Sequence, residues 1–443
     1  MGSGARLYVC IDEYDNFTNT ILAGSRESYE ALCHGEGFFK QFFNELKLAT
    51  TGIGAPITRL FVTGVTPVTM DDVTSGFNIA SNISLNPAFA AFTGFTHGDV
   101  RAMLAYYRAH AGFAFDEEAV FETMRRWYDN YRFSPETGPD GKEPPRVANP
   151  TLVLYYMQYF LQNHKPQPEL VDRNLRTDYM KIRHVITEGR RINGNFHRLE
   201  DLLARLGATA TLRKSFQARE LGVADNFVSF LFYNGLVTVT GERLGRSTLG
   251  IPNLTVGEFL HDFVPKAYQD LNGIDPRLFD VANAMTDFAE TGDWRAPLET
   301  AASVVSRYWK VRDAVEGERV VQTALCSLLY VGHGPYIVRH ERESAGGFVD
   351  IAFEPQLARW PEIGHAALVE LKYLKASDDA SPAALAKIRD AAAAQLARYA
   401  ADHDLARAWN LKEQGGTVTL HRVVLVFHGG DVALCEAIGT AEP

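Results

Sequence analysis

Two carboxylates and a lysine near the C-terminal end of the chain form a pattern that can do chemistry on a phosphate. Asp350 lies in the apolar run 348–353, and Glu370 and Lys372 lie in the run 367–372. Because side chains alternate across a strand, Glu370 and Lys372 share one face. Two acidic oxygens suit a hard cation such as Mg²⁺. An ammonium beside them can orient water or offset developing phosphate charge.

The element that must bring these side chains together is a β-hairpin. Gly346 and Gly347 precede the first run, and a polar loop that contains prolines separates it from the second. Two short apolar runs separated by turn residues predict two paired strands. Asp350 would then lie on the strand beside Glu370 and Lys372, and the three side chains would converge. The alternative is a surface ion-pair ladder on a half-buried hairpin.

These residues resemble the PD-(D/E)XK nuclease superfamily, with Asp350 as the first acidic residue and 370–372 in the E-x-K position. The resemblance implies a restriction-endonuclease-like α/β domain and metal-dependent hydrolysis of phosphodiester bonds. It implies that Asp350 and Glu370 hold Mg²⁺ or Mn²⁺. Lys372 would orient the attacking water and stabilise charge in the transition state.

The resemblance extends to both sides of the hairpin. Upstream, 316–325 is expected to form the first helix of the domain, and the resemblance implies that Glu318 is a further metal ligand. Downstream, Gln395 and Tyr399 lie four residues apart, hence on one helix face. The resemblance implies that Gln395 positions the substrate or the lysine. The run 423–427 is expected to supply a buried strand.

A second candidate site lies near the N-terminus. The apolar run 7–11 ends in Asp12 and Glu13, which is the form of a Walker B element. In such an element the aspartate holds Mg²⁺ through water and the glutamate activates the attacking water. The alternative is a buried strand that runs into an acidic turn. The apolar run 57–65 predicts a strand beside it that presents a polar residue at its C-terminal end.

Several segments between residues 6 and about 260 resemble an AAA-ATPase-like family that is commonly fused to a PD-(D/E)XK domain. They are 12–15, 75–78, 94–96, 127–133 and 149–150.

The element that would cradle nucleotide phosphates is not found in the sequence. There is no G-x-x-x-x-G-K-[ST], the pattern whose backbone N–H groups and lysine bind them. The pair Gly141-Lys142 is followed by Glu143. We therefore expect a truncated or degenerate ATPase-like region. Asp12 and Glu13 would bind a nucleotide such as ATP only if a Walker A element is supplied from elsewhere.

The middle of the chain is expected to be helical. The stretch 96–127 has a helical pattern, and a helix end at 227–233 followed by a hairpin over 235–251 resembles a winged helix. Such a module can bind DNA or pack as a lid, and we favour the lid because a fold does not determine a function.

The predicted fold class is α/β, with three domains. They are a truncated AAA-like parallel-sheet core over 1–133, a helical and winged-helix-like region over 134–310, and a nuclease-like domain over 311–443.

Composition limits the partners of the chain. No apolar run approaches membrane-spanning length and no signal peptide opens the sequence, so we expect no membrane partner. Four widely separated cysteines fit a reducing cytoplasm. The net charge of −10 provides no global basic field, so nucleic acid would need a local basic surface. The candidates for it are Arg339, Arg342, Arg359, Lys375, Lys387 and Arg398.

Together the patterns favour a metal-dependent nuclease that acts on nucleic acid, DNA in preference to RNA. One alternative is an ATP-binding regulatory protein with an inactive nuclease fold. The other is a non-enzymatic DNA-binding or assembly module. A homo-oligomer is compatible with each.

Overall fold

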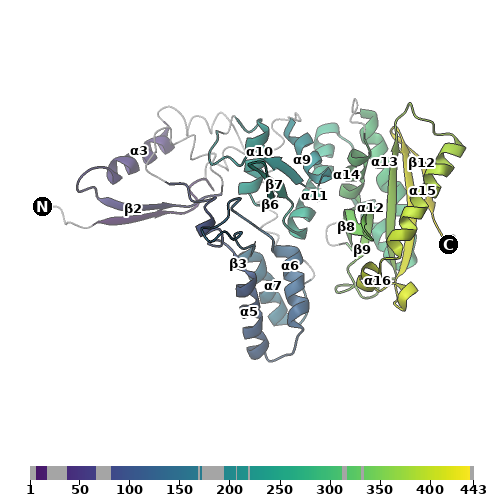
Figure 1. Cartoon of the computed structure of the whole chain (residues 1–443), viewed down its shortest axis with the longest axis horizontal. Coiled ribbons are helices and arrows are strands. Elements are labelled where there is room, and N and C mark those ends of the chain that lie inside the picture. Colours follow the sequence, from purple (N-terminus) through teal and green to yellow (C-terminus); the bar gives the residue numbers. More distant parts are fainter. Residues whose placement is uncertain are drawn as a thin grey trace. The chain divides into compact units, whose positions relative to one another are not determined.

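The computed structural model describes residues 6–16, 37–65, 81–167, 170–171, 194–205, 207–217, 220–311, 317–330 and 334–439. Within them the chain forms helices and strands of the predicted α/β class (Figure 1). Two compact units divide the chain, 1–257 and 258–443. The three predicted domains, with boundaries at 133 and 310, stay a prediction.

The first unit begins with a two-stranded parallel sheet. Strands β1 (Leu7–Ile11) and β2 (Ile57–Val62) pair in parallel, as the apolar runs predict. Helix α3 (Phe38–Thr50) packs on β2 and buries Phe43. The segment 75–78, which carried part of the family resemblance, lies outside the described residues.

The helical pattern over 96–127 consists of two helices rather than one. Helix α5 (His97–His110) begins with a capping box, in which Thr96 and Asp99 each bond the other's backbone N–H. Helix α6 (Glu117–Tyr128) begins at Asp116, whose carboxylate accepts two N–H groups of the first turn. Each cap satisfies donors that a helix start leaves unpaired. The other elements here are η1 (Pro87–Phe89), β3 (Phe95–Thr96), β4 (Val147–Ala148) and α7 (Pro150–Asn163).

The first unit also contains a three-stranded antiparallel sheet with two helices. Its sequence order is α9 (Gly194–Ala204), β5 (Gly207–Ala210), α10 (Ala224–Tyr233), β6 (Thr238–Arg243) and β7 (Arg246–Gly250). The strand order in space is β5-β7-β6. Helix α10 is buried along 226–232.

The second unit is built on a five-stranded sheet of order β12-β11-β10-β9-β8. Helices α12 (Leu278–Thr291) and α14 (Glu318–Leu329) pack on it from one side and α15 (Pro382–Ala400) from the other (Figure 1). Because helices cover both faces, the central strand is apolar without alternation, and residues 366–369 are fully buried. The strands are β8 (Tyr336–Ser344), β9 (Gly347–Pro355), β10 (His365–Leu374), β11 (Thr419–His428) and β12 (Asp431–Ala437).

The topology of the sheet places the predicted hairpin at its middle. β9 and β10 pair antiparallel as predicted, and β10 and β11 pair in parallel over their whole length. Parallel neighbours need a crossover, which α15, α16 (His403–Ala408) and η4 (Lys412–Gln414) provide. The remaining helices are α11 (Leu254–Asn272) and α13 (Arg295–Val311).

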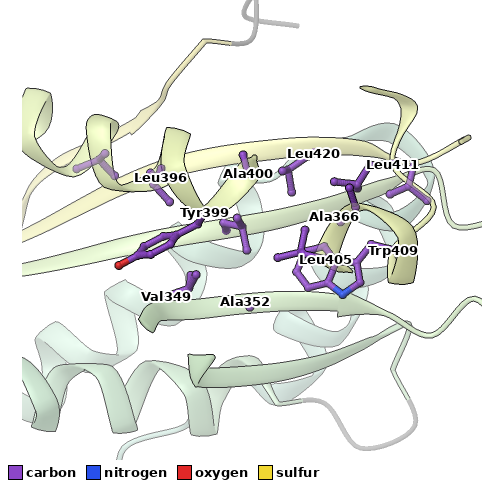
Figure 2. Close-up of a cluster of buried hydrophobic side chains, with 14 of the residues drawn as sticks. Val349, Ala352, Ala366, Leu396, Tyr399, Ala400, Leu405, Trp409, Leu411 and Leu420 are labelled. Carbon is purple, nitrogen blue, oxygen red and sulfur yellow. The ribbon is translucent and has the colours of Figure 1, made fainter. Parts of the chain in front are cut away.

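An apolar cluster joins α15 and α16 to the sheet (Figure 2). Leu396 and Tyr399 of α15 and Trp409 lie over Val349 of β9 and Leu368 of β10, and all five are buried. Residues 366 and 368 contribute to this side of β10, which gives way to Glu370 and Lys372 farther along the strand. The cluster therefore fixes the strand that carries the two charged residues.

Among the described residues, no helix is long and apolar enough to cross a membrane.

Candidate active site

The candidate site lies where β9 separates from β10. Their ladder pairs Phe353 with Ala367 and ends with Ile351 opposite Val369. The next residue of β9, on the side away from the loop that joins the two strands, is Asp350. Its carboxylate Oδ2 accepts the N–H of Leu371, at 2.8 Å between nitrogen and oxygen. A side chain thus satisfies a β10 donor that would otherwise lose its partner as the strands diverge.

The other neighbour of β9 is irregular at the same place. β8 pairs His340 with Ile351 and Arg342 with Val349. Between them Glu341 has a φ of 49°, in the left-handed region that is unusual for a residue with a side chain. The strand that carries the candidate aspartate therefore leaves regular pairing on both sides.

A buried glutamine of α14 holds the backbone at this point. Gln322 is 4% exposed, and its Nε2 donates to the carbonyl oxygen of Asp350 at 2.7 Å. Sequence reasoning missed this residue. A signal exists, because Gln322, Leu325, Cys326 and Leu329 follow the spacing of one helix face and all are buried. A glutamine on such an apolar stripe needs a hydrogen-bond partner.

Lys372 lies between the two predicted carboxylates. Its Nζ donates to Glu370 Oε1 at 2.9 Å and lies 3.5 Å from Asp350 Oδ2. The Glu370 side chain is 2% exposed and that of Lys372 is 29% exposed. The structure therefore brings Asp350, Glu370 and Lys372 together, as strand alternation and the hairpin predict.

Burial perturbs the acid–base properties of this group. Burial, and after it the charge of Asp350, raise the pKa of Glu370 to about 7 against the opposing effect of Lys372. Burial also raises the pKa of Asp350, again against Lys372. Burial disfavours the charged form of Lys372, but Asp350 and Glu370 outweigh it and raise its pKa. Lys372 therefore remains protonated, and its ammonium interacts with both carboxylates.

Among the described residues, no hydrogen bond joins the other two predicted site residues, Glu318 and Gln395, to this group. Glu318, at the start of α14, directs Oε2 to the backbone N–H of Tyr373, at 3.3 Å. Burial raises its pKa, with Lys372 opposing. Gln395 is half-buried on α15, and no hydrogen bond joins it to Asp350, Glu370 or Lys372 in the described part of the chain. Their predicted roles as metal ligand and positioning residue stay predictions.

The donor set at this site fits a divalent cation. Glu370 Oε2 is buried and has no hydrogen-bond partner. An anionic oxygen in that position needs a positive partner, and carboxylate oxygens are what Mg²⁺ and Mn²⁺ prefer. In the described ranges, no three His, Cys, Asp or Glu side chains are gathered closely enough to hold an ion by themselves. An ion here would take two carboxylates from the protein and complete its shell with water or substrate, as Mg²⁺ commonly does.

Most of the predicted basic surface is already engaged. Arg339 and Arg342 both pair with Glu354, at 2.7 and 3.1 Å. Arg359 stacks over Trp360, and Arg398 lies over the ring of Tyr399. Arg319, the second residue of α14, has a side chain that is 60% exposed and lies 3.8 Å from Glu341, the irregular residue of β8.

The N-terminal candidate site has a defined geometry of its own. Asp12 and Glu13 follow β1 and are exposed. Asp12 Oδ1 accepts the Glu13 N–H at 3.0 Å and the hydroxyl of Thr63, the polar residue directly after β2. Glu13 has a φ of 49°, and its carboxylate accepts the Asn16 amide at 2.9 Å. The two parallel strands thus present an acidic pair and a threonine together at their carboxyl ends.

Models of known protein families match the two regions of the chain that contain the candidate sites. Residues 316–437 match the model of the PD-(D/E)XK nuclease superfamily, and residues 2–74 match a model described as a predicted AAA-ATPase. Both resemblances seen in the sequence are confirmed, although the ATPase-like match ends at residue 74 rather than near 260. No curated protein and no solved structure matches the chain.

Proposed function

We propose that the PD-(D/E)XK domain of this chain is a metal-dependent nuclease that hydrolyses phosphodiester bonds. One observation carries the proposal. Asp350 and Glu370 converge on Lys372 at the point where β9 and β10 separate, within a domain of a nuclease superfamily. Two carboxylates and an ammonium with perturbed pKa values, in a partly exposed position, are groups that hydrolysis of a charged ester can use.

Asp350 and Glu370 would hold the ion, Mg²⁺ or Mn²⁺, and Glu318 would join them as a third ligand only if its carboxylate left the N–H of Tyr373. When bound, such an ion offsets negative charge on the phosphate and lowers the pKa of coordinated water. The unpartnered Oε2 of Glu370 is the atom that supports this assignment most directly.

Lys372 cannot ligate the ion, because a protonated amine has no lone pair. Its Nζ is already fixed by the two carboxylates, so its charge is preorganised beside the reacting phosphate. Glu370, with a pKa near 7, would hold a proton in part of the molecules and release it as the ion binds. Gln395 would position the substrate or the lysine from α15.

DNA in preference to RNA is our proposal for the substrate. The order of elements over 194–250 supports a winged-helix-like module, but helix α10, which would have to enter a groove, is buried along its length. We infer that this module packs within the protein rather than reads DNA, so the cleavage site is the place at which nucleic acid would bind.

A nucleotide-binding role is the second candidate. The exposed pair Asp12 and Glu13 beside Thr63 favours it, since this is the arrangement that positions Mg²⁺ and water at a nucleotide. A phosphate cradle would have to be supplied from elsewhere. The ATPase-like region would then regulate the nuclease rather than act by itself.

The test is incubation of the purified chain with single- and double-stranded DNA and RNA, with Mg²⁺, with Mn²⁺ and with a chelator. The proposal expects cleavage that requires the ion and disappears in Asp350→Ala. Cleavage that persists in the chelator or in Asp350→Ala would come from a contaminant or from another site. If no substrate is cut under any condition, the nuclease assignment is wrong.

A further inference from the structure

The hairpin of strands β6 and β7 closes in a turn that its residue types do not favour (Figure 1). Leu244 and Gly245 connect the strands, with φ values of 51° and 77°. Turns of this length prefer asparagine, aspartate or glycine where φ is positive, because a bulky side chain is strained there. Leu244 is also 97% exposed. The turn therefore presents a large apolar side chain to solvent at a cost in backbone energy.

The two residues that flank this turn are both arginines. Arg243 of β6 lies directly opposite Arg246 of β7 in the strand register, and both are exposed. Like charges that lie directly opposite each other on two strands destabilise the pairing. In the described part of the chain, Arg243 has no carboxylate partner that would offset the repulsion. The turn thus carries positive charge that nothing beside it neutralises.

The positive charge continues to the start of helix α10. The carboxylate of Asp225, in the first turn of α10, lies 3.3 Å from Arg246 and 3.6 Å from Arg213. One negative charge is therefore shared by two guanidinium groups, whose side chains are 50% and 53% exposed. Glu242 is exposed too, but it pairs with Ser247 one step along the ladder, so its side chain lies on the opposite face of the hairpin from the arginines.

This surface suits a chain of phosphates. A guanidinium group binds phosphate through two parallel hydrogen bonds. Arg213, Arg243 and Arg246 stand at three separate positions around one carboxylate, an arrangement that fits an extended polyanion better than a single ion. Leu244 lies between two of them at the tip. Proteins that enter the minor groove of DNA combine arginines with inserted apolar side chains in this way.

We propose that the β6–β7 turn and Arg213 form a DNA-backbone contact, built from residues other than those of the cleavage site. The arginines bind phosphates, and Leu244 enters the minor groove. The choice of DNA as the polyanion rests on the proposed nuclease function. Phosphates carry no sequence information, so the contact is independent of base sequence. It requires no recognition helix, which agrees with the burial of α10.

The experiment measures the affinity of the full-length protein for double-stranded DNA at salt concentrations from about 50 to 200 mM. Ca²⁺ replaces Mg²⁺ to prevent cleavage. The wild type is compared with Arg243→Gln, Leu244→Asn and a control, Arg108→Gln. Arg108 is an exposed arginine of the same unit, on α5, so its loss changes the net charge equally. Vesicles that contain phosphatidylserine serve as a second polyanion.

We expect Arg243→Gln to reduce the slope of log affinity against log salt by about 0.9, the contribution of one phosphate contact, which is a ~8-fold loss of affinity at about 0.1 M salt. Its melting temperature should be unchanged or higher, because the pair of like charges is relieved. Leu244→Asn should raise the melting temperature, since asparagine tolerates a positive φ, and should weaken binding without changing the slope. Arg108→Gln should bind like the wild type.

The inference is wrong if Arg243→Gln binds DNA with the affinity and salt slope of the wild type. It is also wrong if Arg108→Gln loses as much affinity, because net charge would then be responsible. Unchanged affinity in Leu244→Asn would remove the minor-groove contact. Vesicle binding that depends on Arg243, without binding of DNA, would make a membrane surface the partner. A wild type that binds DNA through Arg243 but cuts no nucleic acid would leave this inference standing and remove the proposed nuclease function.

Discussion

The buried glutamate at the site should make the C-terminal unit less stable as the pH rises. The pKa of Glu370 is raised from 4.5 to about 7 by burial and by Asp350. Below about pH 4.5 the group is protonated in folded and unfolded chains alike, and its contribution to stability is fully present. Above pH 4.5 the unfolded chain releases the Glu370 proton, whereas the folded chain retains it up to about pH 7 and above that pH must bury a charged carboxylate. The free energy of unfolding therefore falls as the pH rises.

Glu370→Gln removes that penalty, because glutamine is neutral at every pH. A tenfold change in proton affinity is worth about 1.4 kcal/mol, so a pKa of about 7 in place of 4.5 amounts to roughly 3 kcal/mol at pH 8. For a unit of this size, 258–443, each kcal/mol shifts the melting temperature by ~2–4 °C. The melting temperature of the variant, relative to that of the wild type, should therefore increase by on the order of 6–12 °C as the pH rises from 4.5 to 8.

The assay is differential scanning calorimetry with a chelator present, at several pH values from 4.5 to 8, on the wild type and Glu370→Gln. Glu343→Gln is the matched control, because Glu343 is an exposed carboxyl of the same sheet. The control should follow the wild type at each pH. A difference between Glu370→Gln and the wild type that stays constant, or that shrinks as the pH rises, would refute the reasoning.

Three further predictions concern the metal, the backbone and the nucleotide. The affinity for Mn²⁺ should increase as the pH rises through 7 in the wild type, since the ion displaces the Glu370 proton, and a flat titration would contradict this. Gln322→Leu should cost about 1–3 kcal/mol and also weaken Mn²⁺ binding. Gln356→Leu is the control, because it loses a similar hydrogen bond to a backbone carbonyl away from the site, and it should reduce stability without changing the affinity for Mn²⁺. If both variants changed the affinity for Mn²⁺ equally, Gln322 would not position Asp350. The chain alone should not hydrolyse ATP, and turnover that falls on Glu13→Gln would show that a phosphate cradle exists.

The convergence of Asp350, Glu370 and Lys372 could be predicted because it depends on the alternation of side chains along a strand, which is a local property of the sequence. Alternation along β10 places Glu370 and Lys372 on one side whatever the rest of the fold does. The hairpin then brings Asp350 to the neighbouring strand. The positions of the two strands of the hairpin were predictable for the same reason, since apolar runs and turn residues are local signals.

The parts that could not be predicted depend on long-range partners. The divergence of β9 from β10 at Asp350 and the irregular Glu341 on β8 belong to the sheet, and no residue type marks them. The role of Gln322 depends on which strand lies under α14. Arg339 counted as available positive charge in the sequence, but its cross-strand carboxylate, Glu354, neutralises it.

The break within the helical stretch over 96–127 was also not predicted from the sequence pattern. Both of its halves are amphipathic, so the period continues across the break. The first helix ends at His110, just before Gly112, which has a φ of 77°, and the side chain of Asp116 then accepts two backbone N–H groups and starts a new helix. A glycine followed by a capping residue inside a helical pattern was the signal.

The central claim is that a carboxylate pair binds the ion while the lysine between the carboxylates acts on the reaction. The most direct test is calorimetric titration of Mn²⁺ together with cleavage of single-stranded DNA, on the wild type, Lys372→Met and Asp350→Ala. We expect Lys372→Met to bind Mn²⁺ as well as or slightly better than the wild type, since a competing positive charge is lost, and to cut ~100-fold more slowly or worse. Asp350→Ala should lose binding and cleavage together. Full cleavage by Lys372→Met, or Mn²⁺ binding that survives in Asp350→Ala, would contradict the account.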